Sequence, residues 1–274
     1  MLDCVKYVNH RNQEIIFGEG EYFLNESELR DFKWRYSDTF NRIVNINRKG
    51  VVEKTIPIIV YSNNGIEAKN RLFEIFERDV LAKKPGRFWV GEYYCEGYIL
   101  ESTKENYLIN RNLLNLEVIF VTDKAYWVRQ TVSTFARYSD VENQDYMLEY
   151  PYDYDYDYYD TGLASLTICN EHFDASEYIL LINGQVNNPR IEISGHVYEV
   201  AHEVKSGEVL EINSKNRTIT LIQADGGRVN LFNYRSTDYE IFQKIPPGIS
   251  TVSWTGEFEF ELTLLEERSE PKWI

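Results

Sequence analysis

Alternating aspartates stand out in the most acidic stretch of the 274-residue chain, at Asp153, Asp155 and Asp157. An EF-hand calcium loop opens with carboxylates at alternate positions, but it also needs glycine at its sixth position and glutamate at its twelfth. Those positions hold Tyr158 and Ala164. The spacing therefore excludes an EF-hand. It favours a solvated acidic linker, with some other calcium contact as the alternative.

A second acidic series, Glu257, Glu259 and Glu261, offers the carboxylates that a glycosidase uses. Such an enzyme needs an acid and a base or nucleophile on either side of one bond, in environments that separate their pKa values. Side chains alternate across a strand, so these three glutamates would share one wet face. The series therefore predicts an exposed strand face. The residues expected on the opposite, buried face are Phe258, Phe260 and Leu262.

The four histidines are scattered at His10, His172, His196 and His202. No HExxH or HxH spacing brings two of them to one metal ion, and no GxSxG motif supplies a serine to pair with them. Gly18-Glu19-Gly20 is not followed by the third glycine of a phosphate-binding loop or by a helix. We therefore predict no catalytic residues, no metal site and no cofactor.

Tryptophan leaves one binding hypothesis, because an exposed indole can stack on a sugar beside polar groups. Trp254 and Trp273 are the candidates by residue type. Packing in a core or at a sheet edge is the competing interpretation, and it is the one we expect.

Composition points to a folded, β-rich protein. Hydrophobic residues make up 43% of the chain and aromatic residues 15%, enough for one or two packed cores. The aromatic and β-branched excess, with recurrent strand-like alternation, favours strands over helices. Lysine and arginine total 29 against 44 aspartates and glutamates, a net charge of −15. Such a field repels polyanions, so we expect no nucleic-acid partner.

The cysteines Cys4, Cys95 and Cys169 are odd in number and form no CxxC pair. They indicate neither a disulfide framework nor a zinc site, and we expect buried free thiols. The N-terminus lacks a secretory leader, and no apolar run approaches the roughly 18 residues of a membrane span. We expect synthesis in a cytoplasm and no membrane insertion.

One helix is predicted near residues 65–83. Asn64 is the expected N-cap, with Glu67 three residues later in an arrangement like a capping box. Lys83 and Lys84 suit its C-terminal dipole, and the following Pro-Gly pair ends it. Its apolar stripe, which predicts packing against a sheet, is Leu72, Phe73, Phe76 and Val80.

The remaining pattern divides into two β-rich domains, in line with a chain longer than about 150 residues. Residues 1–142 alternate as short strands, including 32–36 and 54–60, around the single helix. Residues 143–160 form the acidic tyrosine and aspartate linker. In residues 161–274 short strands and turn signals follow each other regularly, which indicates a β-sandwich or jelly roll.

The end of the chain carries a more specific pattern. A turn at residues 246–248 leads into a last hairpin that closes with Arg268 and, five residues on, Trp273. This resembles the closing strands of siphophage distal tail proteins. Three further segments resemble the same family: residues 88–99, 184–193 and 207–212.

The resemblance implies an N-terminal ring-forming tail domain and a C-terminal galectin-like β-sandwich. It implies a structural virion protein without enzymatic activity, synthesised in the host bacterium's cytoplasm and placed at the distal end of the phage tail. The implied partners are five further copies in a hexameric ring, the tail tube protein, the tail-tip hub protein and receptor-binding proteins. The alternatives are a carbohydrate-binding module that contacts the host surface and, third, a hydrolase with convergent carboxylates.

Overall fold

The computed structural model describes residues 4–48, 50–105, 111–137 and 164–273. The predicted linker, residues 143–160, lies outside these described residues, and so do Asp153, Asp155 and Asp157. Within the part that is described, no helix is both long and apolar enough to cross a membrane.

The chain divides into two compact units. The first comprises Met1–Arg129 with Glu267–Ile274, and the second comprises Gln130–Glu266. The division thus falls well before residue 142, because Phe135 already packs in the core of the second unit. The last eight residues group with the first unit, whereas the sequence pattern assigns them to the second domain.

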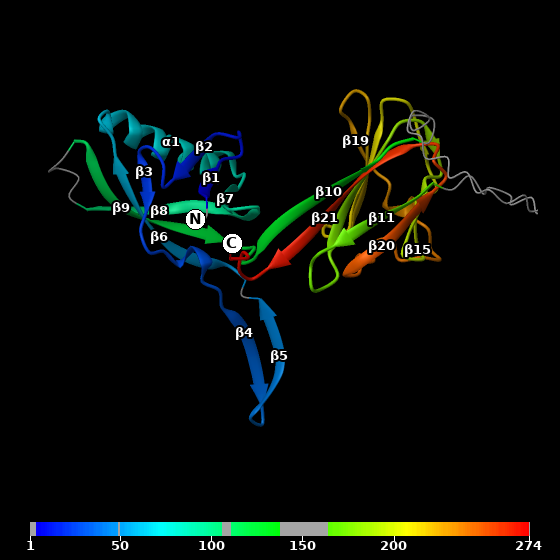
Figure 1. Ribbon diagram of the computed structural model, residues 1–274, viewed down its shortest axis with the longest axis horizontal. Helices are drawn as coiled ribbons and strands as arrows, with labels where there is room; N and C mark the ends of the chain where they lie inside the picture. Colours follow the sequence, from blue (N-terminus) through cyan, green and yellow to red (C-terminus); the bar gives the residue numbers. More distant parts are fainter. Residues whose placement is uncertain (1–3, 49, 106–110, 138–163, 274) are drawn as a thin grey trace, which may run out of the picture. The chain divides into compact units, whose positions relative to one another are not determined.

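Antiparallel strands build the first unit, and β8 (Tyr93–Glu105) joins its two strand groups (Figure 1). One group has the order β10-β8-β7-β1-β2, and the other consists of β3, β6, β9 and β8. Only the start of β10, up to Arg129, belongs to this unit, and the rest of the strand belongs to the second. β8 takes part in both because its first half pairs with β7 and its second half with β9. The bounds of the other elements are β1 (Val5–Val8), β2 (Glu14–Phe17), β3 (Tyr22–Leu24), the 3-10 helix η1 (Glu28–Arg30), β4 (Trp34–Thr39), β5 (Arg42–Arg48), β6 (Val52–Tyr61), β7 (Gly86–Val90), β9 (Leu113–Thr122) and β10 (Trp127–Phe135).

Helix α1 (Gly65–Ala82) lies where the sequence predicts it. Its start differs in detail, because the Asn64 side chain donates to the Glu67 carboxylate and caps no backbone N–H. Lys83, in the left-handed conformation with φ 53°, ends it. Of the predicted stripe, Leu72 and Phe76 are buried, while Phe73 and Val80 are half-buried.

Asp79 is a buried acid on the core side of α1 that the sequence pattern does not reveal. Its carboxylate accepts hydrogen bonds from the Tyr7 hydroxyl at 2.6 Å and the His10 backbone N–H at 2.9 Å, and His10 Nδ1 lies 2.5 Å away. Burial, and then the bond to Asp79, raises the pKa of Tyr7. A Cβ at Gly86 would overlap the Tyr7 hydroxyl and the Asp79 carboxylate. The carboxylate therefore joins α1 to β1, with β7 packed closely against it.

Replacing Asp79 tests this joint. In Asp79→Ala the Tyr7 hydroxyl and the His10 N–H lose their acceptor, so we expect the free energy of unfolding of the first unit to fall by about 2–4 kcal/mol. Urea denaturation followed by tryptophan fluorescence measures it. Asp123→Ala, at an exposed position of the same unit, is the matched control. Equal stability of the two variants would contradict the role assigned to Asp79.

The second unit is a sandwich of two antiparallel sheets, as the sequence predicts (Figure 1). One sheet has the order β19-β18-β17-β12-β21-β10 and the other β11-β20-β14-β15. Inward side chains from both sheets form one core, with Leu180, Ile212 and Leu262 on one side and Ile191 and Val252 on the other. The bounds are β11 (Ala164–Asn170), β12 (Glu177–Asn183), β13 (Val186–Asn187), β14 (Arg190–Ile193), β15 (His196–Glu199), β16 (Glu203–Val204), β17 (Val209–Asn213), β18 (Thr218–Ile222), β19 (Arg228–Asn230), η3 (Phe232–Tyr234), β20 (Gly248–Trp254) and β21 (Glu259–Arg268).

The cysteines correct one expectation. All three are free thiols, but Cys4 and Cys169 are exposed and only Cys95 is buried. Cys169 faces outward because its neighbours Ile168 and Asn170 point into the sandwich and side chains alternate along β11. Burial raises the pKa of the Cys95 thiol to about 11.

Thiol labelling checks this arrangement. The native protein at pH 8 should react rapidly with DTNB at two thiols, because a thiolate must form and meet the reagent. The third thiol should react only after denaturation. Rapid reaction of Cys4→Ser/Cys169→Ser in the native state would show that Cys95 is accessible, contrary to the structure.

Candidate functional site

The tryptophans and glutamates singled out by type are packed or solvated. Trp254 is buried, and its indole N–H donates to the Phe258 carbonyl at 3.1 Å. Trp273 is 74% exposed, but the Arg30 guanidinium lies 3.9 Å from its ring centre. Core packing thus holds for Trp254. The glutamate series occupies the outer side of β21 and its preceding turn, with Glu257 and Glu259 exposed, Glu261 half-buried, and the predicted Phe258, Phe260 and Leu262 buried.

The four histidines serve four separate local contacts. His10 faces Asp79, and the His172 ring lies in the turn after β11 with its Nδ1 near the Asp174 backbone. His196 Nε2 lies 2.9 Å from the Glu240 carbonyl, and His202 packs edge-on against Tyr234. Over the described ranges, no group of three or more histidines, cysteines, aspartates or glutamates could hold a metal ion.

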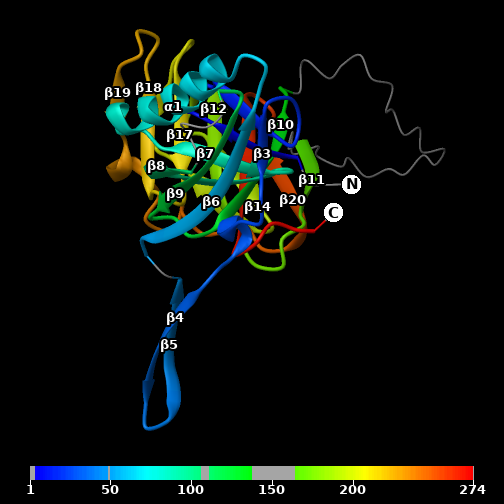
Figure 2. The same cartoon turned by 90° about the vertical axis from the view of Figure 1, so that its left-hand side faces the viewer.

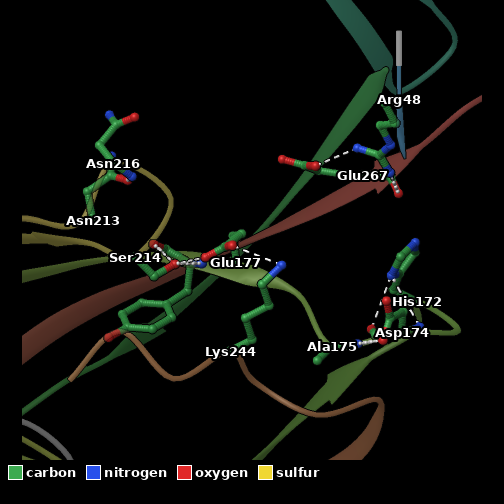
Figure 3. Close-up of polar contacts among 11 residues, drawn as sticks. Arg48, His172, Asp174, Ala175, Glu177, Asn213, Ser214, Asn216, Lys244 and Glu267 are labelled. Atoms are coloured by element: carbon green, nitrogen blue, oxygen red, sulfur yellow. Dashed lines mark hydrogen bonds and ion pairs between the residues drawn. The ribbon is translucent and has the colours of Figure 1, made fainter. Parts of the chain in front are cut away.

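A serine beside a carboxylate and a lysine invites a catalytic interpretation in the second unit (Figure 3). Ser214 Oγ lies 2.6 Å from Glu177 Oε2, and Lys244 Nζ lies 2.9 Å from Glu177 Oε1. The serine is buried, however, and its oxygen accepts the Tyr178 backbone N–H at 2.7 Å. The cluster therefore ties the turn after β17 to β12.

The first unit contains an exposed β-hairpin that does not pack against the core of that unit. β4 and β5 pair only with each other, with Trp34 opposite Arg48 and Tyr36 opposite Ile46. Figures 1 and 2 show this ribbon extending away from the rest of its unit. We call residues 32–48 the arm. Every arm residue except Arg48 is exposed.

The arm is amphipathic even though neither of its faces meets a core. Because side chains alternate, one face carries Trp34, Tyr36 and Ile46. The opposite face of the same stretch carries polar side chains, among them Arg35, Ser37, Asn45 and Asn47. An isolated two-stranded hairpin is at best marginally stable in water. Its apolar face is therefore a surface suited to another molecule.

The tip of the arm is a tight turn that carries an exposed aromatic side chain. Phe40 and Asn41 both have positive φ, 50° and 59°, as the central residues of a type I′ turn require. This conformation costs a β-carbon-bearing residue on the order of 1–2 kcal/mol. Phe40 is nonetheless 97% exposed. The tip thus presents an aromatic ring that the described residues of its own chain leave almost fully exposed.

The root of the arm, by contrast, is firmly held. Arg48 pairs with Glu267 at 2.7 Å (Figure 3). Its guanidinium also lies 4.9 Å from the centre of the Tyr126 ring. On the other side, the buried Lys54 amine donates to the carbonyls of Glu28, Leu29 and Asp31. Burial lowers the pKa of Lys54. These bonds anchor η1, from which the arm departs.

The arm also differs in charge from the rest of the protein. It contains four basic residues, Lys33, Arg35, Arg42 and Arg48, against the single acid Asp38, which makes its net charge +3. The whole chain carries −15. A basic arm on an acidic body is complementary to another copy of the same body.

Sequence reasoning found the strand at residues 32–36 but missed its partner β5 and hence the arm. The available signal was the alternation of Val44 and Ile46 with Asn45 and Asn47. An apolar residue that awaits a partner looks in sequence like one that faces a core. The arm is therefore defined by tertiary structure, in which β4 and β5 pair with no other strand.

Comparison with solved structures places this fold. The chain is similar to the Dit (gp 19.1) protein of phage SPP1, described as a paradigm of the hub adsorption apparatus in phages that infect Gram-positive bacteria; the TM-score is 0.57 at 7% identity, over 97% of this chain and 99% of that one. It is also similar to a chain of the phage P2 baseplate in its activated conformation with Ca, with a TM-score of 0.60 at 12% identity over 99% and 100%. The same baseplate with Sr gives 0.59 at 12% identity over 99% and 100%.

No family model and no curated protein matches the sequence. The structural likeness nevertheless covers nearly the whole chain and nearly the whole of each similar structure. The chain therefore has the all-β fold of phage distal tail and baseplate hub proteins, and at the level of the fold the resemblance noted in the sequence is confirmed.

The anchoring of the arm can be tested by hydrogen exchange. In Arg48→Met the ion pair with Glu267 is lost, so we expect several-fold faster amide exchange in β4 and β5 near the root. Arg35→Met, on the polar face of the same ribbon, is the control and should leave exchange unchanged. Identical exchange in both variants would mean that the ion pair does not hold the root.

Proposed function

We propose that this chain is a structural distal tail protein of a long-tailed phage. Six copies form a ring at the end of the tail tube and join the tube protein to the tip hub, and the protein catalyses no reaction. The fold it shares with baseplate and hub proteins supports this role. The arm is the observation that carries it, because it supplies an apolar contact surface that the described residues of its own unit leave exposed.

A closed cyclic ring needs two different complementary patches on each copy, since its interfaces are heterologous. The arm is one such patch, with an apolar face, an aromatic tip and positive charge. Burying its apolar face between neighbours would remove that face from water and stabilise the ring.

The competing functions have less support. The tryptophan of the second unit, Trp254, is buried and cannot stack on a sugar. Glu257 and Glu259 are exposed and line none of the described cavities. The hydrolase therefore has no described site among these glutamates, and the buried Trp254 provides none for sugar binding in the second unit.

Light scattering after size exclusion tests the ring. We expect a species of six times the 32.4 kDa chain mass, formed by the chain alone or on addition of tube and hub proteins. Tyr36→Ser/Ile46→Ser, on the apolar face, should dissociate it, whereas Asn45→Ser/Asn47→Ser, on the polar face, should not. A chain that stays monomeric even with both partner proteins present would rule out the proposed function.

A further inference from the structure

A second apolar surface of the first unit lies between α1 and β8. A cavity of about 320 Å³ is lined there by Phe73, Phe76, Val80, Ile99 and Leu100. This volume is near the lower end of the roughly 300–1,000 Å³ of ligand pockets, so it suits one aromatic side chain better than a large ligand. We call it the α1–β8 groove.

The backbone of β8 is irregular at this groove. Ile99 pairs with Phe120 and Glu101 with Ile119, so Leu100 is an extra residue without an opposite partner. Such a β-bulge redirects a side chain. Leu100, 57% exposed, is the apolar side chain that results at the groove.

Two carboxylates lie at the rim of the groove. Glu77 and Glu101 stand exposed at its rim. One basic group is present, Lys104, whose Nζ lies 4.6 Å over the Phe73 ring. The groove thus offers an apolar floor and two carboxylates at its rim.

The tip of the arm matches these features in order. Phe40 supplies an exposed aromatic ring for the apolar floor, and Arg42 supplies an exposed positive charge for the two carboxylates. Both views show the arm leaving the first unit on the side away from α1, so the tip cannot reach the groove of its own chain (Figures 1 and 2). The complementary occupant is therefore the tip of a second copy.

We propose that the Phe40–Arg42 tip of one copy seats in the α1–β8 groove of the next copy. Phe40 enters the apolar floor, and Arg42 lies between Glu77 and Glu101. This inference rests on the proposed ring, for which it names the second patch of the heterologous interface. Because tip and groove lie on different parts of one unit, the contact repeats from copy to copy.

Disulfide trapping locates the tip. In the Cys4→Ser/Cys169→Ser background, Phe40→Cys and Leu100→Cys chains are mixed and oxidised. We expect a covalent dimer joining one chain of each kind. Ile66→Cys, exposed at the start of α1 and outside the groove lining, replaces Leu100→Cys in the control and should trap little.

The outcomes separate the two proposals. If a six-copy species forms but Leu100→Cys gives no more covalent dimer than Ile66→Cys, the tip–groove contact is overturned and the proposed ring remains. A cysteine can also be introduced into the tube or hub protein. If Leu100→Cys then forms its disulfide with that protein and not with a second copy, the proposed tip–groove contact is overturned. Absence of any oligomer overturns the ring and the groove together.

A charge exchange provides an independent test. Glu77→Lys/Glu101→Lys places like charges against Arg42, so the oligomer should dissociate at concentrations at least about tenfold higher than the wild type. Adding Arg42→Glu to this double variant should restore much of the lost stability of the oligomer. Glu74→Lys, on the same helix but outside the groove lining, should change little. Failure of the rescue in a folded triple variant would show that Arg42 does not meet this rim.

Discussion

A two-stranded ribbon cannot bury either of its own faces, and this constraint governs the first unit. The arm holds its shape by backbone pairing, yet its apolar side chains stay in water when the chain is alone. Full burial of one large apolar side chain is worth about 1.5–3 kcal/mol. Covering Trp34, Tyr36, Phe40 and Ile46 therefore offers several times that gain, from which association entropy and side-chain ordering must be subtracted.

Polar contacts hold the root of the arm, whereas the arm itself is exposed to solvent. Lys54 binds three carbonyls of the segment before the arm, and Arg48 pairs with Glu267 from the end of the chain. A surface that is already oriented loses less entropy on binding than a flexible one. The polar contacts at the root thus fix the orientation of the arm, and its apolar face provides the contact surface.

Local patterns made much of the fold predictable. The α1 stripe and the alternation of Phe258, Phe260 and Leu262 report burial directly, because each reflects the period of its element. Asp79 was not predictable, since a charged residue on a helix looks solvated until its partners Tyr7 and His10, 72 and 69 residues away, fold against it. The arm was missed for the converse reason: its apolar residues face no core, and only tertiary structure reveals that they are exposed.

Electron cryomicroscopy of the assembled protein tests the central claim most directly. The account predicts a ring of six copies in which the apolar face of each arm, at Trp34, Tyr36 and Ile46, is covered by the adjacent copy. A ring in which all six arms remain exposed to solvent, or an assembly without cyclic symmetry, would contradict it.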